Sequence, residues 1–255
     1  MIQIQNLQKS FNGAQVLRGV DFEIHDGETL VVIGRSGGGK SVLLKHLCGL
    51  MQPDAGRVVV DGVDIEPLSE RELTPIRKKF GVLFQGAALF DSMTVFENVA
   101  FPLREERKAE EPEITQRVEQ ALTIVDLLNA KDKKPAELSG GMRKRAGLAR
   151  ACVANPKYIL YDEPTTGLDP VLADHINDLI LRTRDQLHVT SLAVTHDMTS
   201  AYKIADRIAM LHEGRIHAVG TPKEIQATTD PIVRQFVTGT AEIQKEVSHG
   251  TETVR

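Results

Sequence analysis

The arrangement of hydrophobic and polar positions predicts strands and turns over the first 65 residues. Ile2 and Ile4 alternate with polar residues, and apolar stretches at 16–24, broken at Arg18-Gly19, and at 58–60 are flanked by turn residues. Between them, an apolar strand at 28–33 runs into a glycine-rich turn, after which leucines at helical spacing predict a helix at 41–50. A strand, a loop and a helix therefore follow one another in this region.

The rest of the chain predicts helices first and an alternation of strands and helices afterwards. Residues 70–154 are largely helical and charged, apart from a short strand at 82–84. Strands at 158–161 and 190–194 then alternate with helices at 171–187 and 199–205, before a hairpin at Glu213-Gly214. This alternation is typical of a mostly parallel sheet with helices on its faces, so we expect an α/β fold.

Composition narrows the class of protein. Hydrophobic residues make up 41% and charged residues 26% of the 255 residues, and the net charge is −4. These values are those of a soluble globular protein and give no basic excess, so we expect no nucleic-acid partner. We find neither a long apolar run nor a signal peptide, which predicts a cytoplasmic chain that can still dock on a membrane protein. Cys48 and Cys152 lie in apolar helical contexts, and we assign them no role.

The segment GRSGGGKS, from Gly34 to Ser41, matches the phosphate-loop pattern and lies between a strand and a helix. Glycines allow backbone N–H groups to turn toward phosphate oxygens, and the helix N-terminus favours negative charge. Lys40 would add a point charge at the phosphates and Ser41 a hydroxyl for Mg²⁺. The alternative is a glycine-rich turn with an exposed lysine. We expect ATP to contact Gly34, Arg35, Ser36, Gly37, Gly38, Gly39, Lys40, Ser41 and Val42.

Two further segments carry polar residues next to apolar ones. YILYDE places Asp162 and Glu163 at the end of a buried strand, where Asp162 could hold Mg²⁺ and Glu163 could deprotonate a water. The alternative is an acidic helix cap. In LSGGM, Ser139 and the two glycines Gly140 and Gly141 form a second cluster of N–H groups at a helix start. We interpret the basic run that follows, residues 143–145, as an exposed helix face.

LSGGM, with GRSGGGKS before it in the chain and YDEPTTGLDP after it, resembles the ATP-binding cassette of ABC proteins, and the resemblance covers nearly the whole chain. The resemblance implies a P-loop ABC ATPase fold with an antiparallel β subdomain and an inserted helical subdomain at about 88–154. It also implies one ATP-binding domain over 1–239, followed by a polar tail at 240–255. In this family two cassettes dimerise head to tail, and each ATP lies between the phosphate loop of one and the LSGGM segment of the other.

The resemblance assigns roles to further residues. Phe11 falls where the family stacks an aromatic ring on adenine, with Val16 nearby, and Gln85 matches the glutamine at the cation and the attacking water. Asp169 matches the aspartate that links two cassettes, and His196 the switch histidine near the γ-phosphate. The expected catalytic residues are Lys40, Gln85, Glu163 and His196, and the expected Mg²⁺ ligands are Ser41, Gln85 and Asp162.

Within the family, the chain looks like the separate ATPase subunit of a transporter. Residues 84–105, Met142 after the two glycines, and residues 230–239 resemble the ATPases of MCE-type, or Mla-like, phospholipid transporters. Gly86 and Ala87 depart from the usual pattern there. The resemblance implies phospholipid transport across a bacterial envelope, on the cytoplasmic face of the inner membrane. It implies a permease, an MCE protein and a STAS-domain protein as partners. An importer of a small polar solute and a soluble regulatory ATPase stay open.

Overall fold

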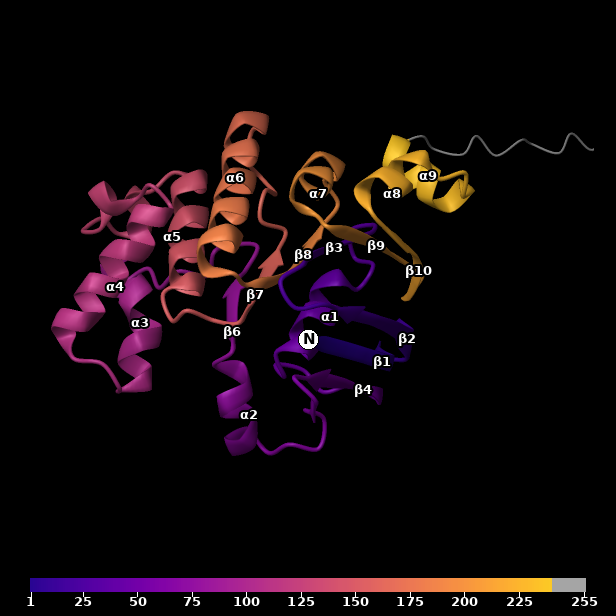
Figure 1. The fold of residues 1–255 in the computed structure, drawn as a ribbon, viewed down its shortest axis with the longest axis horizontal. Helices are drawn as coiled ribbons and strands as arrows, with labels where there is room; N and C mark the ends of the chain where they lie inside the picture. The colour runs from indigo at the N-terminus through magenta and orange to yellow at the C-terminus, as the bar shows by residue number, and fades with distance from the viewer. Residues whose placement is uncertain (240–255) are drawn as a thin grey trace, which may run out of the picture.

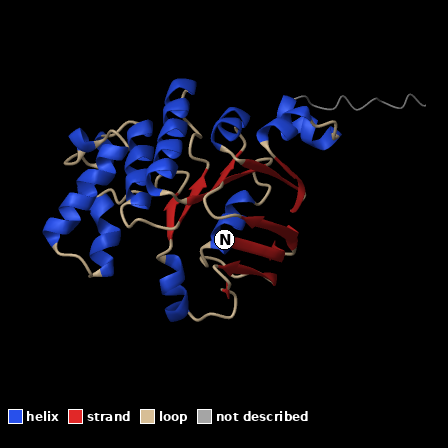
Figure 2. Cartoon of the chain, viewed as in Figure 1, coloured by secondary structure: helices blue, strands red, loops and turns tan. Residues whose placement is uncertain are grey.

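Two β-sheets and a set of helices make up residues 1–239, the part of the chain that the computed structural model describes (Figures 1 and 2). The predicted polar tail at 240–255 lies outside the described residues. Strands of the first sheet, in spatial order, are β2 (Ala14–Ile24), β1 (Ile2–Phe11), β4 (Ala55–Val60) and β5 (Val63–Asp64). All neighbours in this sheet pair antiparallel. The second sheet has the order β10 (Arg215–Gly220), β9 (Arg207–His212), β3 (Thr29–Ile33), β8 (Thr190–Thr195), β7 (Tyr158–Asp162) and β6 (Phe80–Leu83).

The second sheet is parallel from β9 to β6, and only the β9–β10 hairpin is antiparallel. Its strands β3, β7 and β8 are buried on both faces, which explains their continuous apolar sequences. Because these strands are parallel, their carboxyl ends meet at one edge of the sheet, where ligands bind in folds of this kind. The polar residues that follow each strand therefore collect at that edge.

Helices cover the sheets and form a separate cluster. The helices are α1 (Lys40–Leu47), α2 (Glu70–Arg77), α3 (Val95–Glu106), α4 (Glu111–Ile124), α5 (Gly140–Cys152), α6 (Pro170–Leu187), α7 (Met198–Ile204), α8 (Pro222–Ala227) and α9 (Pro231–Thr238), with 3₁₀ turns η1 (Leu128–Ala130) and η2 (Pro135–Glu137). Helices α3 to α5 lie between β6 and β7 in the chain and gather at one end of the molecule (Figure 1). The boundaries of this subdomain at about 88 and 154 stay a prediction.

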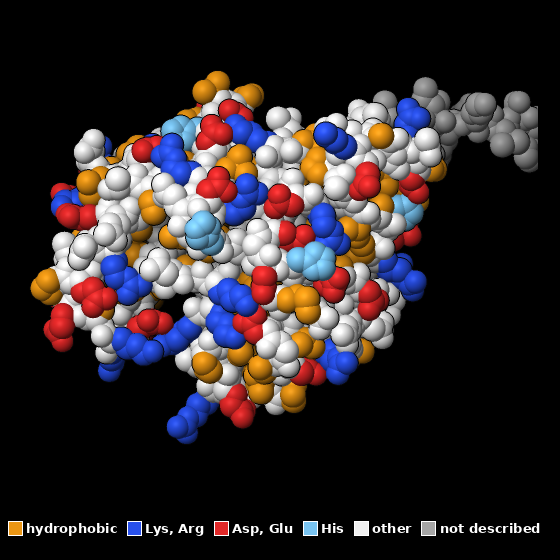
Figure 3. All heavy atoms as spheres, in the orientation of Figure 1, with side chains coloured by type: hydrophobic (Ala, Val, Ile, Leu, Met, Phe, Trp, Pro, Cys, Tyr) orange, Lys and Arg blue, Asp and Glu red, His pale blue; other side chains and the backbone are white. Residues whose placement is uncertain are grey.

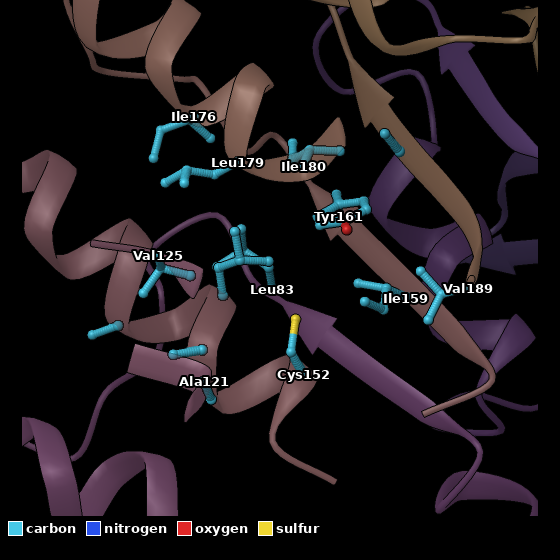
Figure 4. Packing of buried hydrophobic residues seen from close by; sticks show 14 of the residues in the cluster. Leu83, Ala121, Val125, Cys152, Ile159, Tyr161, Ile176, Leu179, Ile180 and Val189 are labelled. Atoms are coloured by element: carbon cyan, nitrogen blue, oxygen red, sulfur yellow. The ribbon is translucent and has the colours of Figure 1, made fainter. Parts of the chain in front are cut away.

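Two apolar clusters hold these layers together. Helix α1 buries Leu43, Leu44 and Leu47 in a cluster that also includes β1, β2, β4 and strands of the parallel sheet, so α1 packs between the two sheets. The other cluster joins the helical subdomain to the opposite face of the parallel sheet. Figure 4 shows its centre, where Leu83, Ile159 and Tyr161 of the sheet approach side chains of α5 and α6. Cys48 and Cys152 are both buried free thiols.

The element boundaries differ from the predicted ones at three places. The predicted helix at 41–50 begins at Lys40 and ends at Leu47, because Gly49 takes a left-handed φ of 64°. The expected break at Arg18-Gly19 is a β-bulge inside a continuous β2. Val20 pairs with Leu7 and Arg18 pairs with Gln8, so Gly19 is the extra residue. The predicted strand at 82–84 is β6, which starts two residues earlier.

Candidate functional site

The phosphate loop, residues 34–41, connects β3 to α1 at the carboxyl edge of the parallel sheet. Gly37 and Gly39 have φ values of 76° and 98°, a left-handed conformation that side chains other than glycine adopt at a cost. A Cβ on Gly39 would also lie 2.9 Å from Cγ1 of Val16. Glycine is therefore required here, both for the turn and for the close approach of β2.

Lys40, the first residue of α1, is buried with 5% of its surface exposed. Its Nζ donates hydrogen bonds to the carbonyl oxygens of Gly34 at 2.8 Å and Arg35 at 3.1 Å. The same ammonium lies 3.4 Å from Oε1 of Glu163. A lysine whose charge is held in this way at a helix N-terminus is placed to bind phosphate oxygens, which rules out the exposed-lysine interpretation.

Ser41 and Asp162 meet beneath the phosphate loop. Ser41 Oγ donates a hydrogen bond of 2.8 Å to Oδ1 of Asp162, the last residue of β7. Burial raises the pKa of the Asp162 carboxyl, the Ser41 hydrogen bond opposes this, and the nearby Glu163 charge raises the pKa further. A hydroxyl, a half-buried carboxylate and the amide oxygen of Gln85 are the hard oxygen ligands that Mg²⁺ prefers. The donor set fits this cation.

Glu163 occupies a strained backbone position directly after β7. Its φ is 49°, in the left-handed region that side chains rarely adopt, and its N–H bonds the carbonyl of Val194 at 2.9 Å. The carboxyl oxygen Oε2 accepts hydrogen bonds from Thr166 Oγ1 and from Nδ1 of His196, each at 2.9 Å. The chain thus fixes both the backbone and the carboxylate of this residue.

The charge state of Glu163 follows from these contacts. Burial raises the pKa of its carboxyl, but the hydrogen bonds from His196 and Thr166 and the Lys40 ammonium lower it more, so the pKa lies below its usual range. Glu163 is therefore ionised at neutral pH. Because an ionised carboxylate only accepts hydrogen bonds, Nδ1 of His196 carries the proton of this pair. A carboxylate in this state can accept a proton from water.

Most of these residues line one cavity of about 400 Å³ at the edge of the sheet, whereas Gly34, Arg35, Gly38 and Asp162 do not line it. Residues on its wall are Val16, Ser36, Gly37, Gly39, Lys40, Ser41, Val42, Gln85, Glu163, Thr166 and His196. A neighbouring hollow of about 510 Å³ shares Thr166 and His196 and extends along the start of α6. The cavity therefore combines the phosphate loop with the residues predicted to activate water.

Other predicted site residues do not line this cavity. Phe11 ends β1 and is 40% exposed, with the Lys9 ammonium 5.7 Å from its ring centroid. Ser139 caps α5 by accepting the N–H of Met142 at 3.3 Å, and Asp169 caps α6 by accepting two N–H groups at 3.0 Å. Gly140 and Gly141 begin α5. Their predicted roles toward nucleotide or a second copy stay predictions.

The interpretation of residues 143–145 as an exposed helix face was wrong for Lys144. Arg143 is exposed, but Lys144 is buried, with 5% of its surface exposed, and donates hydrogen bonds to backbone carbonyls of Gln85 and Glu163. The helical spacing could have predicted the burial of Lys144, because Lys144 lies three residues after Gly141 and four before Leu148 and therefore shares their buried face. Thr166 was also missed, although it stands three residues after Glu163 in a turn.

The chain belongs to the ATP-binding proteins of ABC transporters. The family model described as "ABC transporter" matches residues 17–166. The chain is 31% identical to the cassette MJ0796, solved as a dimer in a post-hydrolysis state with ADP and Pi, with a TM-score of 0.81 over 87% of this chain and 99% of that one. The predicted P-loop ABC ATPase fold is confirmed, and the protein is an ATP-binding ATP hydrolase.

The curated relatives carry different names, and only some of these names refer to transport. A probable ribonucleotide transport ATP-binding protein, Mkl of Mycobacterium leprae, is 46% identical over 93% of this chain and 69% of its own length. TRIGALACTOSYLDIACYLGLYCEROL 3 of Arabidopsis thaliana is 40% identical over 94% of the chain and 74% of its own length. The methionine import ATP-binding protein MetN 1 of Bacillus cereus is 38% identical over 100% of this chain and 76% of its own length. The chain is therefore similar to the ATP-binding subunits of several kinds of transporter.

Proposed function

We propose that this protein is the ATPase subunit that powers phospholipid transport across a bacterial cell envelope. The observation that carries its central part, docking of the ATPase on a permease, is an apolar groove whose lining includes Phe84, the residue before Gln85 of the nucleotide cavity. The groove has a volume of about 490 Å³ and is lined by Phe84, Phe90, Phe101, Pro102 and neighbouring residues of β6, α3 and α5. The Phe90 and Phe101 rings lie 4.9 Å apart, and Phe90 is 44% exposed.

This groove fits an amphipathic helix of a membrane permease. An exposed aromatic cluster of this kind on a charged surface marks a protein interaction site. On the face shown in Figure 3, Lys and Arg side chains are interspersed with Asp and Glu side chains. Among the described helices, none has the length and hydropathy to span a bilayer. Docking on a permease at the inner membrane is part of the proposal, and Phe84 of the groove is next in the chain to Gln85 of the cavity.

The proposed hydrolysis uses the residues that line the cavity. Lys40 and the loop N–H groups hold the β- and γ-phosphates, and Glu163 accepts a proton from a water whose oxygen attacks the γ-phosphorus. The bond from that phosphorus to the bridging oxygen breaks, which leaves ADP and phosphate. His196 holds the carboxylate in place through Nδ1. Mg²⁺, held by Ser41, Asp162 and Gln85, would neutralise phosphate charge.

A second copy would complete the site. The residues that line the cavity include those of the phosphate loop but not Ser139, Gly140 or Gly141, and the family resemblance places the start of α5 against the nucleotide of another protomer. The solved MJ0796 cassette is dimeric. We infer a homodimer with two ATP molecules between the copies, and Asp169 at the contact between them. The adenine base would stack on Phe11.

The lipid assignment rests on sequence similarity. Residues 84–105 and 230–239 resemble phospholipid transport ATPases, and one relative bears the name of a galactolipid. An MCE protein is the expected membrane partner, and a STAS-domain protein stays a prediction of the resemblance alone. The methionine import relative, similar over the full chain, favours import of a small polar solute as a second candidate.

The test is purification of the tagged chain from membranes in mild detergent, with mass spectrometry of proteins and lipids. Phe90→Asp should lose the permease, because it puts a charge in the apolar groove. Val219→Asp is the matched control, since Val219 is also exposed, at 42%, but lies on β10. Recovery of a permease with an MCE protein and phospholipid supports the proposal. A permease with a solute-binding protein supports the second candidate, and equal recovery with both variants contradicts the docking groove.

A further inference from the structure

Helix α5 contacts the loop that carries Gln85 through three residues on one face of the helix. These residues, about one helical turn apart, are Lys144, Gly147 and Arg150. Arg150 donates hydrogen bonds to the carbonyls of Ala87 at 2.6 Å and Ala88 at 2.7 Å. Gly147 allows close packing, because a Cβ there would lie 2.8 Å from Leu83 Cδ1 and 3.1 Å from the Ala87 Cβ. The loop at 84–88 is therefore fixed to α5, the helix that Ser139 caps.

Lys144 connects this helix to both catalytic loops at once. Its Nζ donates one hydrogen bond to the carbonyl of Gln85 and another, of 2.9 Å, to the carbonyl of Glu163. These two residues belong to different loops, one after β6 and one after β7. A single ammonium group thus joins the two loops and α5.

The backbone at both loops is strained and needs such support. Ala87 and Ala88 have φ values of 60° and 47°, and Glu163 has 49°, all in the left-handed region. Non-glycine residues in this conformation cost on the order of 1 kcal/mol each and persist where the surroundings over-determine them. The hydrogen bonds from Lys144 and Arg150 go to the carbonyls of these residues or of their neighbour Gln85.

The charge of Lys144 explains why a lysine stands here. Burying an ammonium costs free energy, and burial lowers the pKa of Lys144, while the Asp162 and Glu163 carboxylates favour its charged form. A neutral side chain that only filled space would avoid this cost. The two carbonyl acceptors and the two carboxylates together keep the ammonium in place.

We propose that Lys144 is a positioning residue that sets the backbone of Gln85 and Glu163 relative to each other and to α5. The inference rests on the proposed roles of Gln85 and Glu163 in hydrolysis. Through Lys144, a movement of α5, whose first turn would meet the nucleotide of a second copy, shifts both groups that handle the attacking water. The residue acts on turnover and not on nucleotide affinity, because it does not line the cavity.

The test compares Lys144→Met and Lys144→Arg in the full chain, with Lys223→Met as the matched control on the exposed surface of α8. Methionine keeps the length and loses the donors, so kcat should fall by about 10- to 100-fold. The KM for Mg-ATP and the affinity for trinitrophenyl-ATP should stay within about twofold of the wild type. Arginine should restore most of kcat, because it donates to carbonyls. Lys223→Met should match the wild type.

Several results would overturn the inference. One is a normal kcat in Lys144→Met, and another is a loss of kcat and nucleotide affinity together that arginine does not restore. If the methionine variant does not fold, the inference is tested with Lys144→Gln, which keeps an amide donor, and with Lys144→Arg. The same kcat, KM and nucleotide affinities are then compared. Glu163→Gln is measured alongside. Full activity in Glu163→Gln would contradict the proposed catalysis itself, whereas an inactive Glu163→Gln with a normal Lys144→Met removes only the positioning role.

Discussion

Glu163 illustrates how single residues reach their chemistry through competing effects. Burial raises the pKa of this carboxyl, and the hydrogen bonds from His196 and Thr166 together with the charge of Lys40 lower it below its usual range, so the carboxylate is ionised. The backbone strain at its φ of 49° is held by the Val194 carbonyl and by Lys144. The site is thus built from side chains of four separate segments of the chain.

Removal of the Lys40 ammonium should weaken nucleotide binding. In Lys40→Ala, the charge-assisted hydrogen bonds to phosphate are lost, at about 1.5–3 kcal/mol, so affinity for trinitrophenyl-ATP should fall by about 10- to 100-fold. Lys45→Ala is the control, because Lys45 is exposed on the same helix. Retention of wild-type affinity by Lys40→Ala would remove the assignment of the phosphate loop.

Glu66 should make stability depend on pH near neutrality. Burial, with the nearby Asp64 charge, raises the pKa of Glu66 to about 7 from its ordinary 4.5. A raised folded-state pKa means that this carboxyl contributes fully to stability below about pH 4.5 and that the contribution is lost as pH rises through about 7.

Glu66→Gln tests this dependence by thermal unfolding at pH 5 and pH 8. Relative to the wild type, the variant should be more stable at pH 8. Each kcal/mol gained in the free energy of unfolding should raise Tm by about 2–4 °C. The gain should shrink toward pH 5. Asp64→Asn is a useful companion, because it removes only the neighbouring charge. An equal difference at both pH values would show that Glu66 titrates normally.

At the scale of secondary-structure elements, the close contact between β6 and α5 fixes the position of the strand that leads to Gln85. A Cβ on Gly81 would lie 2.0 Å from the carbonyl oxygen of Ala151, so only glycine lets the strand and helix approach this closely. Gly81→Ala should destabilise the fold by about 1–3 kcal/mol, the typical cost of overpacking. Gly86 is the matched control, since a Cβ there meets nothing within 4 Å. Denaturant unfolding measures both, and equal midpoints would contradict this constraint.

The elements that follow strong local patterns could be predicted from the sequence. Strands β3, β7 and β8 and helix α6 were expected within a few residues, because long apolar runs and helical spacing report burial directly. The phosphate loop, Asp162 and Glu163 were found because their motifs are local. Lys144 could not be read in the same way, since its partners Gln85 and Glu163 are distant in sequence and meet it only after folding.

At the scale of the whole molecule, the proposed dimer would draw one half of each nucleotide site from each copy. The cavity holds the phosphate loop and the catalytic carboxylate, while the N–H groups at the start of α5 stand on a different part of the surface. The proposed dimer would bring the two halves together around ATP. In the proposed function, the apolar groove, which Phe84 lines next to Gln85 in the chain, would link closing and opening of that dimer to a permease.

The most direct test of this account is the turnover and association state of Glu163→Gln with Mg-ATP. Removal of the base should slow ATP hydrolysis by about 10²-fold or more while binding is retained. Because ATP then stays bound between two copies, light scattering after size exclusion should show an ATP-dependent dimer that the wild type forms only transiently. Near-normal turnover, or a monomer with bound ATP, would contradict the account.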